Sequence, residues 1–193
     1  MNNLLTLTPA EFCAATHACK EGRDWAVTQP TMADVWDNCP RGDWLMWVAL
    51  RVTPAADERT LRLFAVWCAR STPIAGGRVT GDLLTDPRSL AALAVAERYA
   101  NGQATAEELA TAGRAADDAY ADAHYAFAAF AAHAACAAHA AYGYSPAAYA
   151  ARAAADAAAD AAAYDAYTDA RLAQANQFRL MVSNPFPRKE AQS

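Results

Sequence analysis

The fold of this 193-residue chain is decided by residues 105–182, which read TAEELATAGRAADDAYADAHYAFAAFAAHAACAAHAAYGYSPAAYAARAAADAAADAAAYDAYTDARLAQANQFRLMV. Alanine is the commonest residue here, and it is the best helix former because its side chain loses no rotamer entropy. The stretch is interrupted once, where Gly143 suits a helix C-terminus and Ser145-Pro146 suits a helix N-terminus. The sequence therefore predicts two helices of about 37 residues, each about 55 Å long, packed antiparallel as a hairpin.

Clear stop and start signals bound this predicted hairpin. Thr105-Ala-Glu-Glu108 has the pattern of a capping box, in which the threonine hydroxyl and the Glu108 carboxylate each accept from a backbone N–H group of the other residue. At the far end, Asn184-Pro-Phe-Pro187 stops the second helix, because proline cannot continue it. We expect the helical stretch to end near Val182.

The first 102 residues predict a bundle of about five short helices. All five tryptophans lie here, with most of the leucine and valine, so this part is expected to hold the dense core. Five helix-start signals recur along it: Thr8-Pro9, Thr31, Asp43, Thr53-Pro54 and Asp86-Pro87. No run alternates apolar and polar residues as a strand does. The predicted fold class is all-α.

Three parts follow from these patterns. We expect a helical core domain at residues 1–102, the alanine-rich hairpin at 103–183 and a flexible tail at 184–193. Within the core domain, residues 23–30 are expected to form a connection. Residues 71–85 are expected to form a loop, because they contain one proline and three glycines.

The charge pattern narrows the class of partner. The net charge is −5, and residues 103–182 carry nine acidic but four basic side chains. Nucleic acid is therefore not the expected partner, because binding it requires clustered Lys and Arg. An acidic face instead favours a basic protein partner, such as a toxin or effector. No membrane contact is expected, because Asp and Arg recur on both arms of the hairpin, whereas a span requires an uncharged apolar run of about 20 residues.

Cysteine usage predicts the compartment. The five cysteines, at positions 13, 19, 39, 68 and 136, are an odd number without a CxxC pair. The first residues, Met1-Asn-Asn-Leu-Leu5, lack the basic region and the long apolar run of a signal peptide. We therefore expect reduced thiols and a cytoplasmic protein.

One spacing resembles a metal site. His133, Cys136 and His139 follow one another in steps of three, and imidazole and thiolate are ligands for Zn²⁺. Each step turns about 300° around a helix, so the three side chains spread over about 120° and one ion could take two of them. Core packing is the more ordinary interpretation. Cys39 and Cys68 as nucleophiles, with His17 as a base, are a further option that no spacing supports.

Arginine and tryptophan are concentrated between residues 36 and 98. Both types are enriched at binding hot spots, so they predict a partner-binding surface. The alternative, which we favour, is that the arginines pair with Asp43, Asp86 and Glu97 to hold short helices together while the tryptophans fill the core. On the hairpin, an acidic row follows the expected Arg152–Asp156 ion pair, and it is either a solvated face or a docking face. The partner-binding candidates are Arg41, Asp43, Trp44, Arg70, Arg88, Asp156 and Asp160.

Four segments carry a resemblance to a known family. They are ACKEG at 18–22, CPRGDW at 39–44, LRLFAVWCAR at 61–70 and DPRSLAALAVAERYANGQATAEEL at 86–109. The chain resembles the immunity proteins of bacterial and phage genomes that have an Imm-5-like domain, over roughly residues 10–110. Members of that family also end in alanine-rich helices. The resemblance implies a protein that binds and neutralises a toxin, and it carries no catalytic residue over to this chain.

The leading hypothesis is therefore a non-enzymatic, cytoplasmic helical protein, without a cofactor, that neutralises or modulates a partner protein. One alternative is a structural or accessory protein of phage or bacterial origin that forms homo-oligomers through its alanine seam. Another is a metal-dependent enzyme that uses His133, Cys136 and His139.

Overall fold

A computed structural model describes residues 4–52, 57–122, 144–162 and 164–187 of the chain. Within these ranges the protein is all-helical, with nine α-helices, three 3-10 helices and no strand. The 3-10 helices are η1 (Leu4–Thr6), η2 (Ala75–Gly77) and η3 (Thr80–Leu83). The α-helices are α1 (Pro9–Thr16), α2 (Lys20–Ala26), α3 (Met32–Asn38), α4 (Gly42–Val52), α5 (Glu58–Ser71), α6 (Pro87–Ala100), α7 (Ala106–Asp122), α9 (Tyr144–Ala162) and α10 (Tyr164–Met181).

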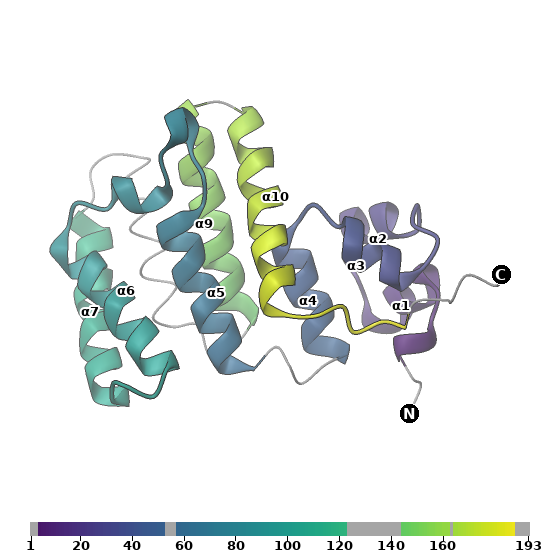
Figure 1. The fold of residues 1–193 in the computed structure, drawn as a ribbon, viewed down its shortest axis with the longest axis horizontal. Coiled ribbons are helices and arrows are strands. Elements are labelled where there is room, and N and C mark those ends of the chain that lie inside the picture. Colours follow the sequence, from purple (N-terminus) through teal and green to yellow (C-terminus); the bar gives the residue numbers. More distant parts are fainter. Residues whose placement is uncertain (1–3, 53–56, 123–143, 163, 188–193) are drawn as a thin grey trace.

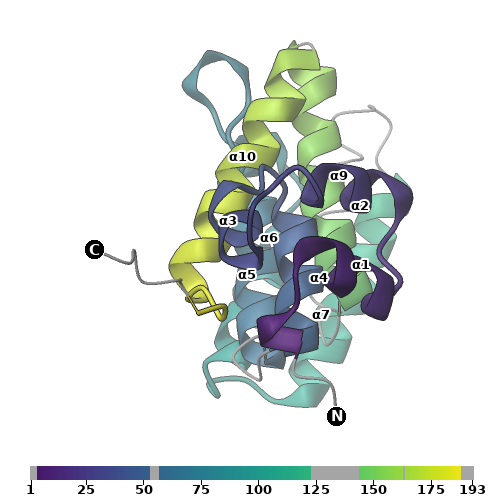
Figure 2. The ribbon, with the colours of Figure 1, turned by 90° about the vertical axis from the view of Figure 1, so that its right-hand side faces the viewer.

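The longer helices stand side by side in a row (Figure 1). From one end to the other, α7 packs on α6, α6 on α5, α5 on α9, α9 on α10, and α10 on α4. The short helices α1, α2 and α3 gather at the far end, in front of α4, α9 and α10 (Figure 2). This end is where the described chain both begins and ends.

The prediction of one long helix for the second arm of the hairpin is wrong. Residues 144–162 form α9 and residues 164–181 form α10, and these two helices pack against each other as antiparallel neighbours (Figure 1). Alanine propensity favours a straight helix and a folded one equally. Folding back lets both halves bury their alanine faces against α4 and α5, which a single helix of about 55 Å could not do.

The first arm begins where the capping box predicts. The backbone N–H of Glu108 donates to the Thr105 hydroxyl at 3.1 Å, and the Thr105 N–H donates to the Glu108 carboxylate at 2.7 Å. The arm is described as far as Asp122, and this part packs on α6. The remainder of the arm and the predicted turn residue Gly143 lie outside the described residues.

Small residues bring α10 and α9 close to the N-terminal helices. Gly42 opens α4, and a Cβ atom there would lie 3.0 Å from the backbone carbon of Gln174 on α10. Many alanines of α9 are fully buried, among them Ala150, Ala154 and Ala158. Most of the buried apolar side chains form one cluster that runs from Phe12 to Phe186. Buried residues on both sides of the expected boundary at residue 102 therefore belong to the same core.

Two expectations for irregular segments need correction. The expected connection at residues 23–30 begins inside α2 (Lys20–Ala26), because Cys19 acts as an N-cap that sequence rules do not anticipate. The start of the tail is also packed. Phe186 is buried with its ring edge-on to Phe12 at 5.9 Å, and the Asn184 side-chain amide donates to Asp37 at 3.0 Å. Residues 188–193 lie outside the described residues.

The predicted loop at residues 71–85 is held to the core by hydroxyl groups. The Thr72 and Thr80 side chains are fully buried, and both donate to the Cys68 carbonyl, at 2.8 and 3.0 Å. Gly81 lies against the backbone of Arg70, where an added Cβ would be 2.7 Å from the carbonyl oxygen. Among the described helices, none has the length and hydropathy that crossing a membrane requires.

Candidate functional site

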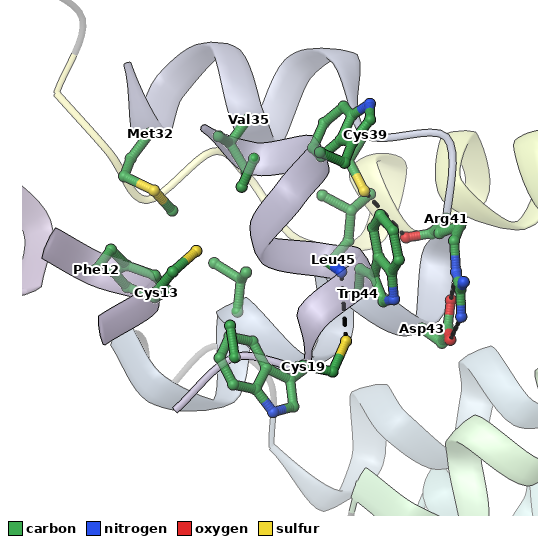
Figure 3. A pocket seen from close by; sticks show the side chains of 16 residues that line it. Phe12, Cys13, Cys19, Met32, Val35, Cys39, Arg41, Asp43, Trp44 and Leu45 are labelled. Carbon is green, nitrogen blue, oxygen red and sulfur yellow. Dashed lines mark hydrogen bonds and ion pairs between the residues drawn. The ribbon is translucent and has the colours of Figure 1, made fainter. Parts of the chain in front are cut away.

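A cavity of about 280 Å³ lies between α1, α2, α3 and α4 (Figure 3). Each helix gives it at least one apolar wall residue, such as Phe12 from α1, Trp25 from α2, Val35 from α3 and Trp44 from α4. Most of its lining is apolar, and the charged exceptions are Arg41, just before α4, and Asp43, in the first turn of α4. The cavity has the apolar walls and few polar groups that are typical of binding pockets, at the small end of their size range.

Local signals hold the short helices that build this cavity. Thr8 and Glu11 form a capping box at the start of α1, where the Thr8 N–H donates to the Glu11 carboxylate at 2.9 Å. His17 ends α1 in the left-handed conformation, with φ of 54°. Two residues later the Cys19 sulfur accepts from the Gly22 N–H at 3.4 Å and starts α2. The chain thus reverses tightly, and the wall residues of α1 and α2 face the same space.

Aromatic rings form much of the wall. The ring centroids of Trp25 and Trp44 are 6.0 Å apart and tilted by 46°, and Phe12 meets Trp47 edge-on at 6.3 Å. These three tryptophans are half-buried, whereas Trp36 is fully buried against Phe178. The expectation that tryptophans fill the core therefore holds for Trp36, while the other three leave part of their surface at a cavity.

Arg41 closes the polar side of the cavity. Its guanidinium binds Asp43 through two hydrogen bonds, of 3.0 and 2.7 Å, and reaches Glu21 at 3.1 Å. The guanidinium carbon also lies 4.2 Å from the centre of the Trp44 ring, which is a cation–π contact. The Arg41–Asp43 ion pair is strong, because it has two parallel hydrogen bonds and is half-buried. Arg171 from α10 approaches the same Asp43 carboxylate at 3.9 Å.

Three cysteines line the cavity, but they differ in exposure. Burial raises the pKa of the Cys13 thiol, and burial raises the pKa of Cys39 to about 11. The Cys39 thiol donates a hydrogen bond to the Arg41 carbonyl at 3.4 Å. Cys19 is exposed at the edge of the cavity. Because the thiolate is the nucleophile, Cys39 is not activated for covalent chemistry, and the proposed base His17 stands exposed at the end of α1.

We expect an alkylating reagent to distinguish these thiols. Iodoacetamide at pH 8 should label Cys19 in the folded protein while Cys13, Cys39 and Cys68 react at least tenfold more slowly, because with a pKa of about 11 only about one Cys39 in a thousand is ionised. Peptide mass spectrometry over a time course measures the four rates. The Cys39 rate should rise with pH up to about 11. Equal rates at Cys19 and Cys39 would show that the cavity opens freely.

Three of the predicted partner-binding residues, Arg41, Asp43 and Trp44, come together at this cavity. The other candidates lie elsewhere. Arg70 pairs with Glu97 and joins α5 to α6. Arg88 binds Asp86 at 2.7 Å and Asp122 at 2.8 Å, which joins the start of α6 to the end of α7. The three pairs expected from the sequence, with Asp43, Asp86 and Glu97 as acceptors, are therefore formed.

The acidic row of the expected hairpin is described in part. Arg152 and Asp156 approach to 3.7 Å on α9, and the arginine is 69% exposed, so this ion pair contributes little to stability. The side chain of Asp160 lies outside what the structure describes, and so do the three predicted metal ligands His133, Cys136 and His139. Within the part of the chain that is described, no three His, Cys, Asp or Glu side chains are grouped to hold a metal ion.

Sequence reasoning missed most of the cavity wall. Trp25 stood in an expected connection, and Phe12, Cys13 and Met32 carried no functional pattern of their own. The one sequence feature that indicated a cavity wall was the high density of aromatic residues between positions 12 and 47. This density could not be assigned to a cavity, because the directions of the four short helices cannot be read from the sequence. Comparisons of the chain with protein-family models, curated proteins and solved structures find no match.

Proposed function

We propose that this protein is a non-enzymatic, cytoplasmic binding protein that neutralises or modulates a partner protein docked at the α1–α4 cavity. The observation that carries the proposal is the convergence of Arg41, Asp43 and Trp44 on an aromatic-walled cavity. Trp and Arg at the edge of a pocket are the residue types that dominate binding energy at protein interfaces. The resemblance to immunity proteins supports the same function.

The chemistry of the cavity favours binding over catalysis. Its carboxylate, Asp43, is held by Arg41, and the buried thiols Cys13 and Cys39 keep their protons at neutral pH. A general base or nucleophile needs a free or activated group near the operating pH. On this proposal the partner is a basic toxin or effector, attracted by the net charge of −5.

Self-assembly through the alanine seam has less support. The alanines of α9 are the obvious surface for such a seam, but Ala147, Ala150, Ala151, Ala154 and Ala158 are already buried within the chain. Light scattering over a range of concentrations addresses this alternative, which expects the mass to rise above that of one 20.5 kDa chain.

The proposed function is tested by point variants of the full chain. Truncation after Gly102 would remove α9 and α10, which supply part of the core, so an unfolded product would mimic a lost interface. We expect Trp44→Ala to weaken partner capture at least tenfold, about 1.4 kcal/mol, because a truncated hot-spot aromatic leaves its pocket unfilled. Affinity capture from cells that encode the protein, followed by titration of the purified partner, measures this loss.

Two further variants keep this test interpretable. Tyr149→Ala removes an aromatic side chain that is 56% exposed on α9, outside the cavity, and should leave the affinity unchanged. Glu21→Lys reverses an exposed charge beside Arg41 without removing a wall residue, so it should weaken binding of a basic partner even if Trp44→Ala folds poorly. A partner whose affinity is the same for all four proteins would refute docking at the cavity.

A further inference from the structure

The size of the cavity limits what can occupy it. An apolar cavity of about 150 Å³ accommodates benzene. The cavity between α1 and α4, at about 280 Å³, is nearly twice that size, which suits two fused aromatic rings. Aliphatic side chains such as leucine would leave much of the space empty, and unfilled space forfeits van der Waals contact.

The wall chemistry favours an aromatic occupant. Trp25, Trp44, Trp47 and Phe12 present ring faces and edges in differing orientations, and aromatic pairs are most stable when tilted or edge-to-face. The Met32 thioether lies on the same wall, and sulfur makes favourable contacts with ring edges. Figure 3 shows Phe12, Met32 and Trp44 among the side chains that line the cavity.

The charges around the cavity favour a neutral occupant. Arg41 is the cationic side chain in the described lining, and its donors are already directed at Asp43 and Glu21. Burial raises the pKa of Cys13 and Cys39, so both thiols are uncharged near neutral pH. An ionised ligand group would lose its hydration here without gaining a free partner of opposite charge.

The exposure of the lining residues shows where the cavity opens to solvent. Cys19 is exposed, and Trp25 and Trp44 are half-buried, so the cavity reaches the surface between the start of α2 and the start of α4. Gly22 lines the same side, where an added Cβ would lie 3.2 Å from the Cys19 sulfur and 3.7 Å from the Trp44 ring. A methyl group added at Gly22 would therefore press on the Cys19 sulfur and on Trp44 at this side of the cavity.

We infer that the α1–α4 cavity binds a neutral bicyclic aromatic ring of indole size. The ring is a tryptophan side chain that projects from the partner protein and anchors it. The identity of the molecule that supplies the ring thus rests on the proposed function. The cavity favours a neutral group with two fused rings. Tryptophan is the common amino acid whose side chain is bicyclic, and this side chain carries no charge.

The test uses N-acetyltryptophanamide as a neutral probe and the full-length protein labelled with ¹⁵N. We expect the indole N–H signals of Trp25, Trp44 and Trp47 to shift in a saturable way, while that of Trp67 on α5, which does not line the cavity, stays in place. The charged probe N-acetyllysinamide should cause no such shift. N-acetylphenylalaninamide should bind at least threefold more weakly than the tryptophan probe. Equal shifts at Trp67, or no shift at all, would overturn the inference.

Filling the cavity provides a matched pair of variants. Ala18→Leu adds a side chain to the lining, whereas Ala15→Leu adds the same group to the exposed face of α1. We expect the first to weaken binding of the tryptophan probe at least tenfold and the second to leave it unchanged. Gly22→Ala puts a methyl group against the Cys19 sulfur and the Trp44 ring, so it should weaken binding at least threefold, and it replaces Ala18→Leu in the test if that variant does not fold. Undiminished binding in the folded filled variants would place the ring elsewhere.

The two proposals fail in different ways. If the probe binds and Ala18→Leu abolishes binding, but no partner depends on Trp44, the aromatic site stands and the proposed function falls. If a partner depends on Trp44 but the probe does not bind, the docking function stands and the tryptophan anchor falls.

Discussion

Replacing Phe178 with alanine is expected to lower the free energy of unfolding by about 3–5 kcal/mol. Phe178 on α10 is fully buried, with its ring 5.0 Å from that of Phe64 on α5 and 6.2 Å from that of Trp36 on α3. It therefore joins three helices that are far apart in the sequence. The alanine variant loses the transfer free energy of the ring and leaves a cavity that rigid neighbouring helices cannot close.

Urea-induced unfolding, followed by far-UV circular dichroism, measures this loss. The matched control is Leu180→Ala, two residues along the same helix, because Leu180 is 83% exposed. Its expected effect lies within about 0.5 kcal/mol of zero, as for most surface substitutions. A loss below about 1 kcal/mol for Phe178→Ala would contradict the docking of α10 between α3 and α5.

The second large effect is expected at Gln174, whose side chain is buried on the same helix. Its amide donates to the Thr72 hydroxyl at 3.1 Å and to the Ala151 carbonyl at 2.8 Å. These bonds connect α10 with the end of α5 and with α9. We expect Gln174→Ala to destabilise the protein by about 2–4 kcal/mol, because two buried acceptors lose a donor and a cavity remains.

Two further variants separate the loss of the hydrogen bonds from the loss of side-chain volume. Gln174→Leu keeps most of the volume but not the donor, and should still cost about 1–3 kcal/mol. Gln177→Ala changes a half-buried glutamine one turn further along α10 and should cost less than about 1 kcal/mol. Thermal and urea unfolding of the three variants measures the differences. If Gln174→Leu were more stable than the parent, the hydrogen bonds would not be stabilising the junction of α5, α9 and α10.

These expectations also bear on the proposed binding site. α10 supports the cavity from behind, since Arg179 donates to the carbonyl oxygen of Trp36 at 2.9 Å and also to that of Cys39, at the end of α3. Phe178 contacts Trp36 on the same helix. Variants in α10 that fold but weaken its packing should therefore shift the cavity walls, and binding assays on them require a check of stability.

The sequence determined by itself those features that depend on neighbours within one helical turn. The capping boxes at Thr8 and Thr105 are formed, and Asp86 accepts from the Arg88 N–H at 2.8 Å to start α6. Such caps act between residues two or three positions apart, so their pattern can be read directly. The pairing of Arg41 with Asp43 and of Arg88 with Asp86 was also predictable, because the partners are two residues apart.

Only the tertiary structure decided where the alanine-rich stretch folds back and which residues share the cavity. Helix propensity is the same for residues 145–182 in one helix or in two, and burial against α4 and α5 settles the choice. The cavity depends on the crossing of four helices of 7 to 11 residues, and one of them, α2, begins at an unusual cap. Short helices obtain their stability and direction from packing, so the convergence of Phe12, Trp25 and Trp44 is a property of the assembled core.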